Sequence, residues 1–383
     1  MRRSTVDSAD VIIVGGGVAG LSAARVLAEK KVRVLLLERE PRLATQASGN
    51  NAAIFRPFEH EAASALLPRR SRQLLDGWFG PTLLEITGLV LVSHAADPVS
   101  RLAAAARSGG VAHSVLDASL LRALVPSLAG GEAHHALLLH EGGVLDVPAL
   151  TAGLARQARA MGAELRANVA VQAFTQARGR ITGVTLAGGE QLAASCVIVA
   201  AGAWNASLGD VSGAEIPLVA LRRHLIELET RADIAAAEPV VWRLEDEVYY
   251  RKQGFGVLAS PCDESRVTLA VSSSAPVVSD ASAPVTLNDK LQRIAPALAH
   301  GSIVRAWACL RTFANDRELV VGSDPRVQGL YWFGGLGGRG MSVAPAAAEW
   351  LSACVLGEAL PPAAAALSPA RLLSAQSSAD RTA

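Results

Sequence analysis

A run of apolar residues that ends abruptly in glycines constrains this chain more than any other feature. Residues 11–14 are typical of a buried parallel strand, and Gly15, Gly17 and Gly20 follow at the spacing G-x-G-x-x-G. Apolar residues then recur at helical spacing, and a second apolar run ends in Glu38, about twenty residues beyond the glycines. Strand, tight turn, helix, strand and acid in this order predict a dinucleotide-binding βαβ unit.

The residue types in this unit suit the chemistry of a dinucleotide. Glycine lets the backbone approach a pyrophosphate, and the helix N-terminus offers free N–H groups and the positive end of the helix dipole. Glu38 can accept hydrogen bonds from ribose hydroxyls, which disfavours the phosphorylated ribose of NADP. The motif by itself therefore leaves NAD and FAD open.

The composition fits a chain with a large apolar core and little charge bias. Its 383 residues are enough for two domains, and 50% of them are hydrophobic. The 36 Lys and Arg nearly balance the 35 Asp and Glu, which disfavours nucleic acid and anionic membranes as partners. No stretch has the length and apolarity of a membrane span, and we expect no signal peptide before the first strand.

The cysteines and histidines show no pattern of a metal site. His134 and His135 are adjacent in a strand-like segment, so their side chains point to opposite faces. We expect no metal, reduced thiols and a cytoplasmic location. The cysteines, which lie far apart, are Cys196, Cys262, Cys309 and Cys354.

Later segments predict that the chain returns twice to the dinucleotide site. The buried strand at 196–200 ends in Ala201 and Gly202, and the strand at 330–333 runs into glycines before an alanine-rich helix at 344–356. A loop of small and amide residues at 45–53 could surround a flat polar ligand, or simply cap a helix.

The remaining pattern predicts an α/β fold with a second sheet. After Pro217 several mixed-polarity strands, the last at 266–272, describe an antiparallel sheet that covers a substrate. The Asp97-Pro98 pair predicts a break in the chain after the strand at 89–93. Residues 361–383 are rich in Ala, Pro and Ser and are expected to be largely a tail. Helices are expected at 62–78, 100–107, 119–125, 147–159 and 287–298.

Together these motifs resemble the FAD-dependent D-amino acid oxidase superfamily, which includes glycine oxidase, sarcosine oxidase and D-arginine dehydrogenase. The resemblance covers almost the whole chain and favours FAD. It is carried by DVIIVGGGVAGLSAARVLAEKKVRVLLLER, EGGVLDVPAL, VIVAAGAWN, CLRTFANDRELVVGSDP and GGLGGRGMSVAPAAAEWL.

The resemblance implies a Rossmann-like FAD-binding domain and an α+β substrate domain on a mixed or antiparallel sheet. The first would comprise residues 9–85, 142–215 and 315–360, and the second 86–141 and 216–314. Val171 would contact adenine through its backbone, and the helix after Gly340 would face the flavin. The other implied FAD contacts are Gly15, Gly17, Val18, Ala19, Gly20, Glu38, Arg39, Ser48, Gly49, Asn50, Asn51, Ala52, Ala53, Ala201, Gly202, Trp204, Cys309, Gly335, Leu336, Gly337, Gly338, Arg339 and Met341.

The resemblance also implies residues that bind a substrate carboxylate. Arg311 in WACLRTF matches the carboxylate-clamping arginine, and Tyr249 in YYRKQGF matches a tyrosine that binds the same group. Arg222 or Arg223 matches a basic position that opens the substrate sheet. The plainer alternatives are a solvent-facing sheet tyrosine for Tyr249, and for Arg311 a surface ion pair with either Asp316 or Glu318.

Other positions depart from the arginine-specific members. Gly88 and Ile54 stand where those members have an acid and a histidine, so a preference for basic side chains is not implied. Instead Arg56, Glu59 and His60 follow the flavin loop, either in the pocket or at a solvated helix entry.

Cys309 is a separate case. It lies two residues before Arg311, where sarcosine oxidase-like members attach the flavin covalently and many relatives have glycine. The alternatives are a covalent cysteinyl flavin and a buried free thiol.

The implied function is oxidation of the Cα–N bond of a D-amino acid or an N-substituted glycine by hydride transfer to FAD, with O2 or a quinone-type carrier as electron acceptor. One alternative is 2-hydroxy acid oxidation with a base such as His60. Another is oxidation of a tRNA wobble-uridine side chain, since ASGNNAA resembles the FAD domain of the bifunctional modification enzyme. The third is a flavoprotein without catalysis.

Overall fold

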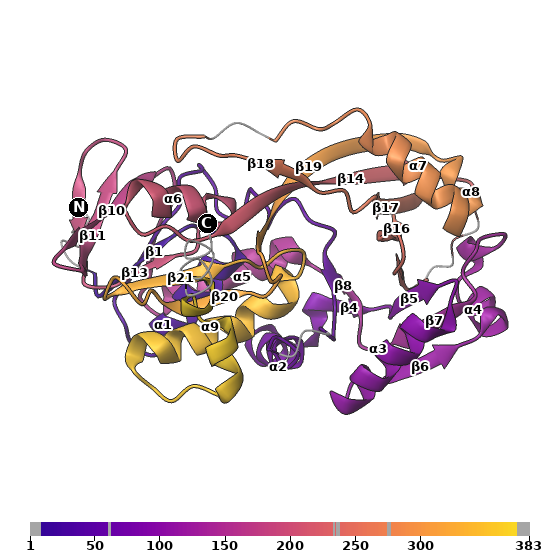
Figure 1. Ribbon diagram of the computed structural model, residues 1–383, viewed down its shortest axis with the longest axis horizontal. Helices are drawn as coiled ribbons and strands as arrows, with labels where there is room; N and C mark the ends of the chain where they lie inside the picture. Colours follow the sequence, from indigo (N-terminus) through magenta and orange to yellow (C-terminus); the bar gives the residue numbers. More distant parts are fainter. Residues whose placement is uncertain (1–8, 60–62, 233, 235–237, 274–276, 374–383) are drawn as a thin grey trace, which may run out of the picture.

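A computed structural model describes residues 9–59, 63–232, 234, 238–273 and 277–373 (Figure 1). Two large sheets dominate it, and the chain passes between them several times. Residue 60, a histidine named above as a base, and the end of the expected tail, 374–383, lie outside the described residues. None of the described helices combines the length and apolarity needed to cross a bilayer.

The first large sheet has six strands in the order β20-β21-β13-β1-β2-β9. Its strands are parallel except β20, which pairs antiparallel with β21. The bounds are β1 (Val11–Val14), β2 (Val34–Leu37), β9 (Glu164–Arg166), β13 (Val197–Val199), β20 (Val320–Ser323) and β21 (Leu330–Gly334).

Both faces of this sheet are covered, which explains why β1 is apolar at every position. Val11 and Ile13 pack against α1 (Val18–Glu29), α2 (Leu67–Phe79), α5 (Val147–Ala160) and α9 (Gly340–Leu356). Ile12 and Val14 pack toward α6 (Asn205–Val211) and the meander β10 (Val171–Ala177), β11 (Arg180–Leu186) and β12 (Gln191–Ala193). Figure 1 shows α1 and α9 on one side of β1 and β13, with β10, β11 and α6 on the other.

The second large sheet has nine strands in the order β18-β14-β17-β16-β15-β5-β7-β6, with β19 paired to β14. It is mixed, because β15 and β5 run parallel while the other pairs are antiparallel. The bounds are β5 (Leu89–Ser93), β6 (His113–Leu116), β7 (His135–Leu139), β14 (Leu218–Glu229), β15 (Val240–Arg243), β16 (Val248–Gln253), β17 (Gly256–Ser260), β18 (Ser265–Val267) and β19 (Ser302–Ala314).

Helices cover the outer face of this second sheet and leave much of the inner face for the first. α4 (Ala118–Leu124), α7 (Ala283–Ile294) and α8 (Pro296–Ala299) bury the outer face, and α3 (Ala96–Ser108) packs beside β5 and β7. A small sheet of β3 (Ile54–Phe55), β8 (Gly143–Leu145) and β4 (Leu84–Ile86) lies along the connections. The strands of each large sheet come from the segments assigned above to one domain, while the exact domain boundaries remain a prediction.

Three local expectations were wrong. Asp97-Pro98 does not break the chain but lies in the first turn of α3, where a proline needs no N–H partner. The strand expected at 266–272 is only β18. Residues 361–373 are not a loose tail, because the 3-10 helix Pro362–Leu367 packs on β20 and both Leu367 and Leu372 are buried.

Candidate active site

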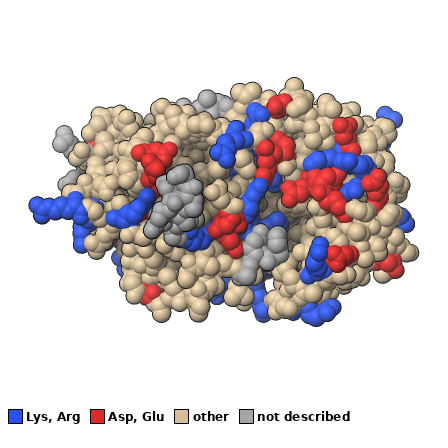
Figure 2. Space-filling model, viewed as in Figure 1, with Lys and Arg blue, Asp and Glu red and all other residues tan. Residues whose placement is uncertain are grey.

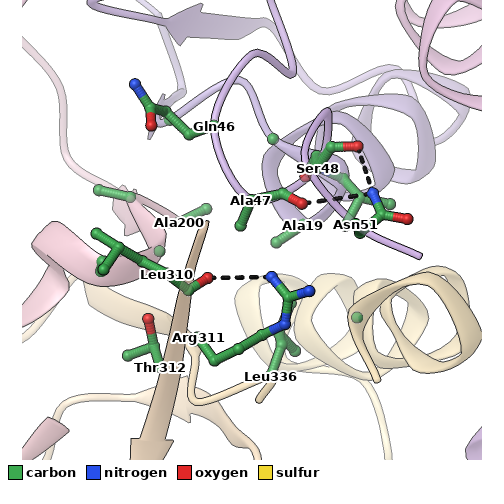
Figure 3. A pocket seen from close by; sticks show the side chains of 18 of the residues that line it. Ala19, Gln46, Ala47, Ser48, Asn51, Ala200, Leu310, Arg311, Thr312 and Leu336 are labelled. Atoms are coloured by element: carbon green, nitrogen blue, oxygen red, sulfur yellow. Dashed lines mark hydrogen bonds between the residues drawn. The ribbon is translucent and has the colours of Figure 1, made fainter. Parts of the chain in front are cut away.

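A large cavity runs from the carboxyl ends of β1 and β13 to the inner face of the nine-stranded sheet. Its empty space, with the open mouth, is about 1630 Å³. The glycine turn, the turn before Gly340 and the strand residues Arg223, Tyr249 and Arg311 all line this one cavity. Figure 3 shows loop residues such as Ser48 and Asn51 across from Arg311 and Thr312.

The glycine turn forms one wall of the cavity. Gly15 has a φ of +109°, and a Cβ there would lie 2.5 Å from the carbonyl oxygen of Ala200. A Cβ on Gly20 would lie 1.9 Å from the carbonyl oxygen of Gly15, so only glycine lets α1 start this close to β1. Gly20 therefore does not line the cavity itself, but it allows the close packing of α1 against the turn that does. Gly17 is the N-cap of α1 and has no side-chain cap, which leaves the helix end open to the cavity.

The loop at 44–53 forms the facing wall. The Val18 N–H donates to Ser48 Oγ at 2.9 Å, which ties this loop to the start of α1. Asn51 shapes the loop, because its Nδ2 donates to the Ser48 carbonyl at 2.8 Å and its Oδ1 accepts from the Ala53 N–H at 2.7 Å (Figure 3). Gly49 and Asn50 do not line the cavity, and Asn50 Nδ2 instead donates to the Thr45 carbonyl.

Glu38 and Arg39 lie at the far end of the cavity. The Glu38 carboxylate accepts from the Gly16 and Glu40 N–H groups, which fixes the turn. The Arg39 guanidinium stacks 3.7 Å above the ring of Trp204, and Arg39 Nη1 donates to the Val271 carbonyl. Trp204 Nε1 and Arg39 Nη2 are both buried without a partner among the described residues. Both donors can therefore form hydrogen bonds to acceptor atoms of a ligand.

A second uncapped helix end points at the cavity from the C-terminal third. α9 begins at Gly340 after the glycine-rich turn, and its N-cap Arg339 makes no side-chain cap. Gly337 has a φ of +53°, and a Cβ there would lie 2.5 Å from the ring of Phe313. Two helix N-termini therefore face one cavity, an arrangement that favours an anionic ligand.

Strand register brings the candidate substrate residues onto one face of the second sheet. Arg223 on β14 is directly opposite Cys309 on β19, and Arg311 follows two residues later on the same face. Tyr249 on β16 is opposite Trp242 on β15, and their rings are 4.9 Å apart. These residues are far apart in the sequence, and sheet pairing alone brings them together.

Arg311 is 6% exposed and lines the cavity. Its Nη1 donates to its neighbour, the Leu310 carbonyl, and no acid among the described residues pairs with its guanidinium. The ion pairs considered from the sequence are absent because Asp316 pairs with Arg371 and Glu318 lies near Arg339.

Tyr249 is also buried and lines the cavity, so it is not a solvent-facing sheet tyrosine. Burial raises the pKa of its hydroxyl to about 12, and the nearby Arg311 and Arg223 only partly oppose this. The hydroxyl is therefore protonated at neutral pH and acts as a hydrogen-bond donor rather than a base.

Of the two neighbouring arginines on β14, the structure places Arg223 rather than Arg222 at the cavity. Successive side chains of a strand point to opposite faces, so Arg222 points away. It pairs with Asp280 at 3.1 Å and donates to the Val278 carbonyl. The sequence motif alone could not fix which arginine faces inward.

In the segment after the flavin-type loop, Ile54 and Arg56 line the cavity. Arg56 lines it and lies 5.2 Å over the ring of Trp242, while Glu59 is buried between Arg56 and Arg339. Sequence reasoning did not identify Glu59 as the residue that anchors Arg339. The local sequence offers no signal that separates Glu59 from Glu61, two residues later.

The comparisons with known proteins decide the family. A family model described as FAD dependent oxidoreductase matches residues 10–354. The chain belongs to this family. It is therefore a flavin oxidoreductase whose cofactor is FAD, as the resemblance implied, and the predicted fold class is confirmed.

Three relatives illustrate the range of the family. Human mitochondrial sarcosine dehydrogenase is 28% identical over 271 residues, which cover 66% of this chain and 29% of that protein. Glycine oxidase of Pseudomonas aeruginosa is 27% identical over 367 residues, which cover 89% and 93%. The tRNA 5-methylaminomethyl-2-thiouridine biosynthesis bifunctional protein MnmC of Burkholderia thailandensis is 28% identical over 414 residues, which cover 97% and 61%. The chain thus spans less than two thirds of the first and third.

A solved structure supports the fold. The L-proline dehydrogenase from P. horikoshii matches 96% of this chain with a TM-score of 0.83 at 20% identity, and the match covers 98% of that chain.

The cavity fits FAD in the hydrogen-bond donors that line it. Two uncapped helix N-termini suit the pyrophosphate and the flavin edge, and the unpartnered donors of Arg39 and Trp204 suit the adenosine end. The predicted contacts that line the cavity are Gly15, Gly17, Val18, Ala19, Glu38, Arg39, Ser48, Asn51, Ala52, Ala53, Val171, Ala201, Gly202, Trp204, Gly335, Leu336, Gly337, Gly338, Gly340 and Met341.

Two other predicted contacts do not line the FAD cavity. Cys309 is buried beside it, and its Sγ donates to the Arg223 carbonyl at 3.4 Å. Arg339 turns away because its guanidinium meets Glu59, Ser64 Oγ and the Arg317 carbonyl. No group of three His, Cys, Asp or Glu in the described part of the chain could hold a metal ion.

Proposed function

We propose that the protein oxidises the Cα–N bond of an amino acid, either a D-amino acid or an N-substituted glycine. The product is an imine, which water hydrolyses, and the electrons pass on to O2 or to a carrier such as a quinone. FAD supplies the hydride acceptor, and the protein supplies binding and orientation.

The observation that carries this proposal is the state of Arg311. A buried charge is costly unless it is paired, yet no carboxylate of the described residues pairs with this guanidinium. The fork of an arginine binds a carboxylate through two parallel hydrogen bonds. The α-carboxylate of an amino acid supplies the missing partner.

Tyr249 would donate to the same carboxylate from the neighbouring part of the sheet. Its pKa of about 12 keeps the hydroxyl protonated wherever the enzyme works. The described cavity lining has no His, Lys or Asp, and its one acid, Glu38, is engaged by the glycine turn. No lining residue is thus available to remove the ammonium proton, and the substrate enters as its free amine.

The relatives support the same substrate class. Glycine oxidase, which this chain matches over nearly its full length, is named for an amino acid, and sarcosine dehydrogenase is named for an N-methylated one.

The test is an anaerobic absorbance spectrum of the purified holoprotein with D-amino acids, N-methylglycine-type amines and 2-hydroxy acids. We expect an amine to bleach the yellow flavin band, with a rate that rises with pH through the pKa of the amine. Bleaching by hydroxy acids alone, or by none of these compounds, would contradict the proposal.

A second candidate is the oxidation of a tRNA side chain, favoured by the match of 97% of this chain to MnmC. That function requires phosphate contacts from Lys and Arg. On the face in Figure 2 the positive and negative side chains are interspersed. We expect no tRNA binding at physiological salt in a gel-shift titration, and salt-dependent binding there would favour this candidate.

A further inference from the structure

Arg223 is a second buried arginine in the substrate end of the cavity. It is 6% exposed and lines the cavity on the same sheet face as Arg311. Arg223 is opposite Cys309, so Arg223 and Arg311 are diagonal neighbours whose Cα atoms are about 7–8 Å apart. Both side chains therefore line the same end of the cavity.

Arg223 retains unused hydrogen-bonding capacity. Its Nη2 donates to Glu264 Oε1 at 2.6 Å, but its Nε is buried without a partner among the described residues. Glu264 is shared, because Arg317 donates to both of its oxygens at 2.9 and 2.7 Å. One carboxylate therefore serves two arginines and leaves Arg223 incompletely compensated.

The surroundings of Arg223 and Arg311 contain little negative charge to balance the pair. Among the lining residues of this end, Trp242, Tyr249 and Thr312 are neutral, and Arg56 is paired with Glu59. Glu264 lies outside the lining, and the other nearby acid, Glu247, is exposed to solvent. A substrate with one carboxylate satisfies the fork of Arg311, and the positive charge of Arg223 remains.

We propose that Arg223 binds a second carboxylate of the substrate, so that the enzyme prefers dicarboxylic amino acids. This inference rests on the proposed function, and it makes Arg223 a specificity-determining residue. The class comprises acidic D-amino acids and N-carboxymethyl amines. The same charge disfavours lysine-like and arginine-like side chains, because like charges in a buried site repel.

The test compares substrates with and without the second carboxylate. Anaerobic flavin reduction is measured for D-aspartate against D-asparagine, D-glutamate against D-glutamine, and iminodiacetate against N-methylglycine. We expect the ratio of reduction rate to dissociation constant to favour the acidic member of at least one pair by roughly 10- to 100-fold. Equal ratios, or a preference for the neutral members, would overturn the inference and leave the proposed function intact.

Three variants assign the preference to Arg223. Arg223→Gln should lower the ratio for the acidic member far more than for the neutral member, so that the preference is lost. Arg223→Lys keeps a charge for Glu264 but loses the fork, and should retain part of the preference if the Gln variant does not fold. Arg222→Gln is the matched control, because it is the adjacent arginine on the opposite face and should keep the full preference. An equal loss for acidic and neutral substrates would mean that Arg223 binds the α-carboxylate, which overturns the inference.

A binding measurement separates this inference from the proposed function. Succinate and malonate should quench Trp fluorescence of the holoprotein at lower concentration than butyrate and propionate, since Trp242 lines the same cavity. If dicarboxylates bind tightly but no amino acid reduces the flavin, the proposed function fails and the anion site stands. If the two classes bind alike, the anion site is wrong.

Discussion

The two ends of the cavity are built in different ways. At the dinucleotide end, backbone turns and helix N-termini at Gly15–Gly17 and Gly335–Gly340 form the walls, and Arg39 and Trp204 add side-chain donors. At the substrate end they come from side chains on separate strands that only sheet register brings together. The first end tolerates almost no change of backbone shape, whereas the second tolerates change of side chain at the cost of substrate choice.

The largest expected effect is at the dinucleotide end. Gly20→Ala places a Cβ 1.9 Å from the Gly15 carbonyl oxygen, so α1 must move away from β1. We expect loss of bound FAD and a destabilisation of roughly 3–5 kcal/mol, measured by flavin absorbance and thermal unfolding. Gly77→Ala is the control, because no atom lies within 4 Å of its Cβ and α2 should gain about 0.5–1 kcal/mol. Normal FAD content in Gly20→Ala would show that the close approach is not required.

A smaller effect, confined to substrate, is expected for Arg311→Met. Loss of the carboxylate clamp should lower the ratio of reduction rate to dissociation constant. The decrease should correspond to a free energy of roughly 2–5 kcal/mol. FAD content should stay normal, and the thermal midpoint should rise, because an uncompensated buried charge is removed. The ratio for Arg311→Lys should lie between those of the wild type and Arg311→Met, since lysine keeps the charge without the fork. A lower midpoint with unchanged substrate binding would assign Arg311 a structural role instead.

Tyr249→Phe should also weaken substrate binding, but less than Arg311→Met does. Losing a hydrogen bond to a carboxylate costs about 1.5–3 kcal/mol, and the pH profile of flavin reduction should not change because the hydroxyl does not titrate below its pKa of about 12. A profile that shifts in the variant would contradict the donor role.

The same substitution tests the alkaline stability of the fold. The folded pKa of Tyr249 is raised from 10.0 to about 12, so its contribution is fully present below pH 10 and is lost as the pH rises toward 12. The loss amounts to at most about 3 kcal/mol. Urea unfolding at several alkaline pH values should show a shallower decline for Tyr249→Phe than for the wild type.

The smallest effect is expected at Cys309, which lies between the two ends. Its Sγ is directed to the Arg223 carbonyl and the residue does not line the cavity. We therefore expect acid precipitation to release all of the flavin from the wild type, and Cys309→Ala to change FAD content little. Flavin colour that stays in the wild-type pellet and disappears in Cys309→Ala would establish the covalent link.

The contrast between the two ends also explains what the sequence could predict. The glycine turn, the strand before it and the acid after it are local, so Gly15, Gly17 and Glu38 could be read from spacing alone. The turn before α9 could be predicted in the same way. The fold class followed from these units and from the resemblance.

The substrate end was less predictable because its geometry depends on long-range pairing. Whether Arg222 or Arg223 faces the cavity depends on the pleat of β14, which the local sequence does not fix. The burial of Glu59 depends on Arg339, far away in the chain. The ordered structure of residues 361–373 was not predicted, because alanines and prolines show no apolar periodicity. The segment is ordered by the burial of Leu367 beside β20.

The order of the strands has a consequence for the time at which the enzyme can acquire its cofactor. The cavity combines the first strand, β1, with the turn that precedes α9, the last long helix. A nascent chain emerges from the ribosome N-terminus first. The glycine turn before α1 is therefore synthesised long before the glycine-rich turn at Gly335–Gly340. Until α9 is synthesised, α1 lacks the helix against which it packs. We therefore expect FAD to bind stably only after α9 has been synthesised, so a chain truncated before α9 should remain colourless.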